Sequence, residues 1–389
     1  MPTCENEQLI MKAFNHEPID KIPSFVQSIM DAVWNAYLAK YEDTILDDTI
    51  LITPIGDMTS FKAFGYSSHW TGVPGTEVEA TDKLKAKVAE MTVEVRKKDP
   101  RLSISIMGGI KGAAIVAGGH SIGWHVGGAI RDAKLLEWWL DQLTIAAPET
   151  SDIDKFIEAR RQCLAQNFVP IPGVSLIMEP APQMIDFAMI SILMRKNPAL
   201  LRRLFNFLTD IGIARAGASL KTGAPLLVIP DDCAYKHGPM ISPAQYRAFV
   251  LPCLQRLTGF IHETNQHAKV FMHTDGDIYS MLDLFVEGGL DGLNPLEVNS
   301  GMNIGRVKKT HGDKLAFVGN LDTAELLPFG TEKAVRRQVH IIIKEGMSNG
   351  VKTGHVFAAC GTLHHAVKME NALAMMDELK KINDGAVSL

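Results

Sequence analysis

The stretch from Lys269 to Asp277, KVFMHTDGD, decides the fold of this chain. Its first four residues are typical of a buried strand, which leads directly into His273, Asp275 and a glycine-bearing turn. In α/β barrels the chemistry lies at the carboxyl ends of parallel strands. His273 and Asp275 are two residues apart, so on extended backbone their side chains would point to the same side. The pair predicts a metal site or an acid–base pair; the simpler alternative is an Asp-Gly turn beside a hydrogen-bonded histidine.

Apolar runs of strand length recur along the chain, and helical patterns separate them. We expect strands near residues 22–27, 49–54, 169–177, 226–230, 269–273, 290–294, 315–319 and 354–359. Eight strand–helix units predict one α/β domain over residues 1–389, a (β/α)8 or TIM barrel. Residues 55–130 would be an insertion after the second strand, lying partly over the barrel mouth. Within them, KLKAKVAEMTVEVRKKD (83–99) alternates in a way that predicts a solvent-facing strand or hairpin.

Composition excludes several classes of partner. The chain has 389 residues, a net charge of -5 and no basic run with interleaved aromatic residues, which excludes nucleic acid. No apolar run approaches the roughly 20 residues that span a bilayer, so we expect no membrane segment. Five scattered cysteines and an amino terminus without a signal-peptide pattern predict a cytoplasmic protein. The oligomeric state stays open, and a homodimer is compatible with the sequence.

Carboxylates, histidines and a thiol follow the later strands, so they would gather at one face of the barrel. This clustering predicts a pocket. The candidate catalytic residues are His273, Asp275, Asp231, Glu297 and Tyr235. The candidate substrate-binding residues are Phe25, Met30, Glu179, Asp232 and Asn320.

Several of these segments resemble the uroporphyrinogen decarboxylase superfamily. The resemblance is carried by MKAFNHEPIDKIP (11–23), PDDCAYKHGPMISPAQYRAFVLPCLQRL (230–257), HTDGDI (273–278), DGLNPLE (291–297), LAFVGNLDTAELL (315–327) and MENALAMMDELKK (369–381). It covers nearly the whole chain in order and implies a (β/α)8 barrel. It also implies one of two activities, which are cofactor-free porphyrinogen decarboxylation and methyl transfer involving a corrinoid on a separate protein.

Residues near the first strand favour methyl transfer. The decarboxylases bind a substrate with eight carboxylates and carry an arginine-rich stretch there, since arginine binds carboxylates bidentately. Here the corresponding stretch is FVQSIMDAVWNAYLAKYED (25–43), and the first arginine of the chain is Arg96. We therefore expect a pocket without the cationic lining of a porphyrinogen site.

The resemblance also implies a metal. Methyltransferases similar to methylcobalamin:coenzyme M methyltransferase bind zinc through a His-x-Cys after one strand and a Cys after the last. On this chain His273 matches the histidine, Asp275 replaces the first cysteine, and Cys360 falls within one residue of the second. His273, Asp275 and Cys360 form an acceptable three-ligand zinc set, with His364, His365 and Glu179 as alternative ligands. A carboxylate in place of a thiolate makes the metal more electrophilic, which favours polarising an oxygen.

These expectations combine into a methyltransferase that demethylates a small substrate, with an aromatic methyl ether as first choice. The methyl acceptor would be cobalamin carried by a partner corrinoid protein; the direction of transfer and the exact substrate stay open. Two alternatives remain. One is a metal-free decarboxylase or lyase that uses His273, Asp275 and Asp232 for proton transfer, and the other is a non-catalytic tetrapyrrole-binding protein.

Overall fold

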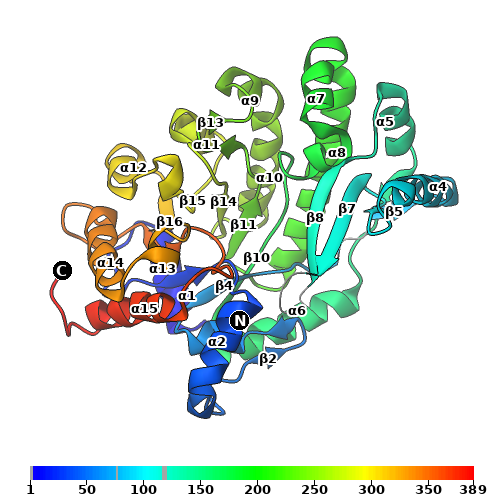
Figure 1. Cartoon of the computed structure of the whole chain (residues 1–389). Helices are drawn as coiled ribbons and strands as arrows, with labels where there is room; N and C mark the ends of the chain where they lie inside the picture. The colour runs from blue at the N-terminus through cyan, green and yellow to red at the C-terminus, as the bar shows by residue number, and fades with distance from the viewer. Residues whose placement is uncertain (1–2, 76–77, 116–120) are drawn as a thin grey trace.

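A computed structural model describes residues 3–75, 78–115 and 121–389. Its centre is an eight-stranded parallel sheet in the order β10-β4-β1-β17-β16-β15-β14-β11 (Figure 1). A parallel bridge between Gly173 and Val228 joins the two ends of this order and closes the sheet on itself. The predicted TIM barrel is therefore confirmed. The barrel strands are β1 (Ser24–Val26), β4 (Ser68–Thr71), β10 (Val169–Pro172), β11 (Leu226–Pro230), β14 (Lys269–His273), β15 (Gly292–Asn294), β16 (Ala316–Leu321) and β17 (His355–Ala359).

Helices surround the barrel and bury its outer face (Figure 1). The described helices are α1 (Glu5–Phe14), α2 (Asp31–Tyr41), α3 (Thr59–Ala63), α4 (Asp82–Lys98), α5 (Ala133–Leu140), α6 (Thr150–Ala165), α7 (Pro180–Lys196), α8 (Pro198–Lys221), α9 (Pro243–Phe249), α10 (Leu251–Thr264), α11 (Leu282–Glu287), α12 (Ile304–His311), α13 (Leu326–Phe329), α14 (Glu332–Gly346) and α15 (Met369–Asn383). None of the helices in the described part of the chain has the length and apolar character needed to cross a bilayer.

The second barrel strand is β4, at Ser68–Thr71, and the prediction that residues 49–54 form a barrel strand is wrong. Residues 52–53 form β2, which pairs only with β3 (Gly56–Asp57) in a small hairpin. The apolar run before Pro54 suggested a buried strand, whereas β4 has the polar sequence SHWT. Its polar side chains are satisfied by β1: the Ser68 hydroxyl donates to the Ser24 carbonyl at 2.9 Å, and the His69 ring lies 3.1 Å from the Val26 carbonyl. A hydropathy pattern does not detect a barrel strand of this kind.

A long excursion connects β4 to β10 and lies to one side of the barrel. It contains α4 to α6 and the short strands β5 (Val78–Ala80), β6 (Ser103–Ile104), β7 (Gly109–Ile115), β8 (Ser121–Gly128) and β9 (Leu143–Ile145). Figure 1 shows β7 and β8 beside α7 and α8. The backbone amide of Gly128 donates to Asp186 of α7 at 2.7 Å, which fixes this placement. The excursion therefore begins after β4, later than the predicted residue 55.

Residues 83–99, predicted to be a strand or hairpin, form helix α4 instead. Leu84 and Val88 are buried and lie four residues apart, which is the spacing of one helix face. The side chain of Thr81 caps the first turn by accepting from the Leu84 amide. The alternation of apolar and charged residues was therefore coincidental, and lysine and glutamate are good helix formers.

Candidate active site

Two neighbouring strands, β11 and β14, carry the acidic residues and the histidine to the same edge of the barrel. Pro230 at the end of β11 is in register with His273 at the end of β14. The Asp231 amide then donates to the His273 carbonyl at 3.0 Å. After β14 the chain turns at Gly276, whose φ is +97°, and a Cβ there would lie 2.6 Å from the Tyr235 nitrogen. Glycine is thus required for the loop that holds Asp275 against the loop after β11.

Three side chains converge at this edge: Asp232, His273 and Asp275. One ligand atom from each lies within 4.8 Å of the other two. The Asp275 amide donates to Asp232 Oδ1 at 2.9 Å, which ties the two loops together. The sequence predicted His273 and Asp275 as metal ligands, and the structure brings Asp232 to them.

The hydrogen bond of His273 determines which ring nitrogen is available. His273 is buried, and its Nδ1 lies 2.6 Å from Oδ1 of Asn294 on β15. The Asn294 Nδ2 donates to the Val318 carbonyl at 2.7 Å, so the Asn294 oxygen faces the ring as an acceptor. His273 Nδ1 therefore donates this hydrogen bond, which leaves Nε2 as the ring nitrogen that could bind a ligand. A histidine that binds a metal through one ring nitrogen usually donates a hydrogen bond from its other ring nitrogen, as His273 Nδ1 does here.

Burial and like charge change the acidity of the carboxyl groups. Burial raises the pKa of Asp275 to about 6; the charges of Asp232 and Glu297 also raise it, and His273 opposes them. Burial also raises the pKa of Glu179, with a further contribution from Asp232. Acids held this close together repel one another when ionised, so the site favours a bound cation or a bound proton.

Asp231 and Glu297 hold loops in place. Asp231 is fully buried, and its Oδ1 accepts from the amides of Ile177 and Glu179 at 2.8 and 3.1 Å. Burial raises the pKa of Asp231 to about 7. Glu297 Oε2 accepts from the Gly276 amide at 2.8 Å. Both residues were predicted to be catalytic, and the contacts observed for them are with backbone amides of the neighbouring loops.

Cys360 lies outside the convergent group. Its Sγ faces the carbonyls of Pro295 and Leu296 at 3.8 and 3.7 Å. Burial raises the pKa of this thiol far above its ordinary value, so the thiol is protonated at neutral pH. The structure thus gives Cys360 the contacts of a neutral thiol.

The remaining predicted residues are spread over the barrel. The side-chain Nδ2 of Asn320 donates to the Leu296 carbonyl, and Phe25 is buried edge-on against Phe271 in the core. Tyr235 is 54% exposed and Met30 is 37% exposed. His364 and His365, the alternative ligands, lie next to each other and outside the convergent group. The Nε2 of His364 lies 2.9 Å from the Thr323 carbonyl.

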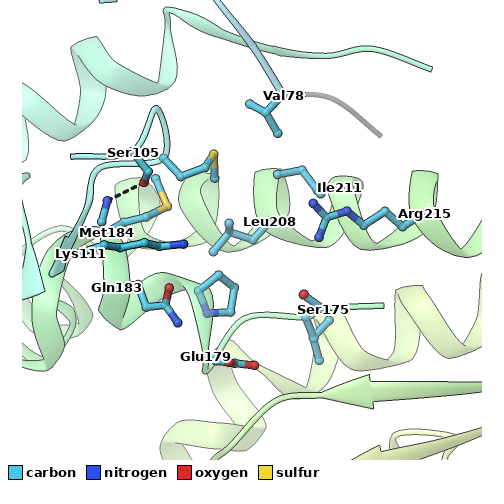
Figure 2. A pocket seen from close by; sticks show the side chains of 14 residues that line it. Val78, Ser105, Lys111, Ser175, Glu179, Gln183, Met184, Leu208, Ile211 and Arg215 are labelled. Carbon is cyan, nitrogen blue, oxygen red and sulfur yellow. Dashed lines mark hydrogen bonds between the residues drawn. The ribbon is translucent and has the colours of Figure 1, made fainter. Parts of the chain in front are cut away.

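A cavity of about 370 Å³ lies where the excursion meets the end of β10. Glu179, at the start of α7, forms part of its wall, and so do two cationic residues, Lys111 of β7 and Arg215 of α8 (Figure 2). We expected a pocket without the cationic lining of a porphyrinogen site, and this cavity has two cationic side chains in its wall. Arg215 was missed because its helix reads as ordinary amphipathic sequence. Asn294 was missed as a partner of His273, although its place at the end of the neighbouring strand was a usable signal.

The donor set of the convergent group fits zinc. One histidine nitrogen and two carboxylate oxygens form a three-ligand set of the kind that zinc accepts with a fourth position open. The hydrogen bond from His273 Nδ1 to Asn294 leaves Nε2 as the ring nitrogen that could bind the metal.

Comparison with known proteins identifies a family model and relatives that match a large part of this chain. The family model for uroporphyrinogen decarboxylase (URO-D) matches residues 169–382. The uroporphyrinogen decarboxylase of Thioalkalivibrio sulfidiphilus is 27% identical over 199 residues, which are 50% of this chain and 53% of that protein. The enzyme of Citrifermentans bemidjiense is 28% identical over 198 residues, 51% of this chain and 54% of its own length. The chain thus spans about half the length of these curated relatives.

A solved structure described as a methyltransferase from Methanosarcina mazei superposes along almost the whole chain. The TM-score is 0.60 at 15% identity, and the match covers 97% of this chain and 99% of the other. At this identity the likeness establishes the shared barrel fold.

Proposed function

This chain belongs to the uroporphyrinogen decarboxylase family, and from this premise we propose that it transfers a methyl group from a small methyl ether to a corrinoid protein. The observation that carries the proposal is the convergence of Asp232, His273 and Asp275, together with the hydrogen bond that holds His273 Nδ1 against Asn294. Such a group is suited to holding a Lewis acid next to a substrate oxygen. Zinc, when bound by these three residues, would withdraw electron density from that oxygen.

The proposed reaction needs a proton as well as a methyl acceptor. When the bond between methyl carbon and oxygen breaks, the oxygen keeps the electron pair and the methyl group leaves to the reduced corrinoid of the partner protein. The departing oxygen therefore becomes an anion unless it is protonated. Burial raises the pKa of Glu179, so this side chain retains a proton to higher pH than an exposed glutamate does. We assign the proton donation to Glu179, which Asp231 holds in place through the Glu179 amide.

Porphyrinogen decarboxylation is the second candidate, because the curated relatives carry that name. Its substrate has eight carboxylates, which need several cations. Of the arginines outside the cavity, Arg131 and Arg247 are paired with Asp186 and Glu287. Two cationic side chains in the observed cavity are a poor match for eight carboxylates, so methyl transfer is favoured.

The test is a direct assay of both reactions. The purified chain, loaded with zinc, is mixed with a reduced corrinoid protein and 4-methoxybenzoate, and the absorbance change that accompanies corrinoid methylation is followed. We expect methylation that requires the chain and is lost in His273→Ala. Consumption of uroporphyrinogen III by the same preparation, without corrinoid methylation, would contradict the proposal and establish the decarboxylase.

A further inference from the structure

Two cationic side chains line the cavity beside β10, and no contact within the described residues accounts for the position of Arg215. Arg215 points into the cavity from α8 and Lys111 points into it from β7 (Figure 2). The Nε of Arg215 is buried and has no hydrogen-bond partner among the residues described. Buried polar groups normally have a partner, so a guanidinium that lines a cavity and has an unpaired nitrogen indicates an anion that is supplied from outside.

The fold brings Arg215 to this position by close packing of α8. Gly212 precedes Arg215 by one turn, and a Cβ at Gly212 would lie 2.6 Å from the Ser175 carbonyl. The absence of a side chain at Gly212 lets the helix approach the segment after β10. Arg215 consequently opens onto the same cavity as Ser175. Burial lowers the pKa of Arg215, yet an arginine keeps its charge at neutral pH.

The rest of the lining indicates the shape of the ligand. Apolar side chains form much of the remaining wall, among them Met107, Met184, Leu208 and Ile211. Glu179 connects the cavity to the metal group, since its backbone amide donates to Asp231, the residue before Asp232, at 3.1 Å. A ligand with an anionic end and an apolar body can therefore lie along the cavity, with its other end toward Glu179.

We propose that Arg215 binds a carboxylate of the substrate, so that the substrate class is a methyl ether that also carries a carboxylic acid. This inference rests on the proposed function for the identity of the ether, and on the cavity alone for the carboxylate. The planar guanidinium of Arg215 presents paired N–H donors that match a carboxylate. The carboxylate would fix the distance between the ligand's anchored end and the ether oxygen.

The test compares an acid with its neutral amide by isothermal titration calorimetry on the whole chain. The probes are 4-methoxybenzoate and 4-methoxybenzamide, which have nearly the same shape and differ in charge. We expect the acid to bind at least tenfold more tightly than the amide. Arg215→Gln should weaken acid binding about 10- to 100-fold and leave amide binding within about threefold, because a charge-assisted hydrogen bond is lost. Arg215→Lys should fall between the two.

Arg203→Gln is the matched control, because Arg203 lies on the same helix, is exposed and pairs with Asp141. It should retain the full preference for the acid. Equal binding of the two probes by the unmodified chain, or an unchanged preference in Arg215→Gln with a wild-type melting temperature, would overturn the proposal. Calorimetry needs no corrinoid protein. A strong acid preference without corrinoid methylation would therefore refute the methyltransferase while leaving the carboxylate site standing.

Discussion

Replacing Asn294 by alanine should weaken zinc binding without touching a ligand. Asn294 holds the His273 ring through a bond of 2.6 Å and is itself held by the Val318 carbonyl at 2.7 Å. Removing such a partner of a ligating histidine typically costs 10- to 100-fold in metal affinity, which is about 1.4 to 2.7 kcal/mol. Two buried groups, the His273 Nδ1–H and the Val318 carbonyl, also lose their partner. We therefore expect the free energy of unfolding to fall by about 2 to 4 kcal/mol.

The assay is a zinc competition titration against a chromogenic chelator, run alongside urea denaturation. Asn371→Ala is the matched control, because Asn371 is also a buried asparagine that donates to a carbonyl, that of Leu327, at 2.8 Å. It should lose stability to a similar degree and keep its zinc affinity. An Asn294→Ala protein whose zinc affinity stays within twofold of wild type would refute the role of Asn294 in orienting His273.

Three further predictions concern stability and the loop at the site. Burial lowers the pKa of His355 to about 4 from an ordinary 6.5, so the unfolded chain takes up a proton that the folded chain refuses. The neutral His355 therefore costs no stability above about pH 6.5, and the free energy of unfolding falls as the pH drops from 6.5 toward 4. His355→Gln, which can still donate to the Gly319 carbonyl, should reduce the loss measured by urea denaturation at pH 5 by about 2 kcal/mol. Glu7 and Arg160 form a buried ion pair, so Glu7→Leu or Arg160→Met alone should each cost about 3 to 5 kcal/mol; the double variant should cost less than the sum, and strict additivity in denaturation would argue against coupling. Gly276→Ala should destabilise the chain and weaken zinc binding at least tenfold, since its Cβ would overlap the Tyr235 backbone and displace Asp275; an unchanged titration would show that the loop tolerates a side chain.

The sequence was sufficient for the fold because seven of the eight barrel strands are apolar runs followed by helices. It failed at β4, where polar side chains bond to the backbone of β1. It also failed at α4, a helix in which apolar and charged residues alternate along the sequence as they would in a strand. At the site, the position of His273 and Asp275 followed from one local segment. The partner Asp232 comes from the neighbouring strand, and its place depends on the register of β11 with β14. Sequence order does not reveal that register.

Cys360 shows that a residue in the expected sequence position need not lie at the metal group. It follows a barrel strand, as a ligand would, but the orientation of its thiol toward two carbonyls depends on the loop after β15. Arg215 lies in the middle of a long helix and reaches the cavity because Gly212 lets that helix approach Ser175. Contacts of this kind arise from packing between distant segments, so no local pattern predicts them.

The zinc content of the purified chain tests the central claim most directly. Protein prepared without chelators and equilibrated with zinc should contain one tightly bound zinc per chain by elemental analysis. Asp232→Asn should lose it, because the remaining two ligands do not retain zinc against buffer, while Cys360→Ser should keep it. A wild-type chain that stays free of zinc, or an Asp232→Asn protein that binds one zinc as tightly as wild type, would contradict the assignment of Asp232, His273 and Asp275 as the metal site.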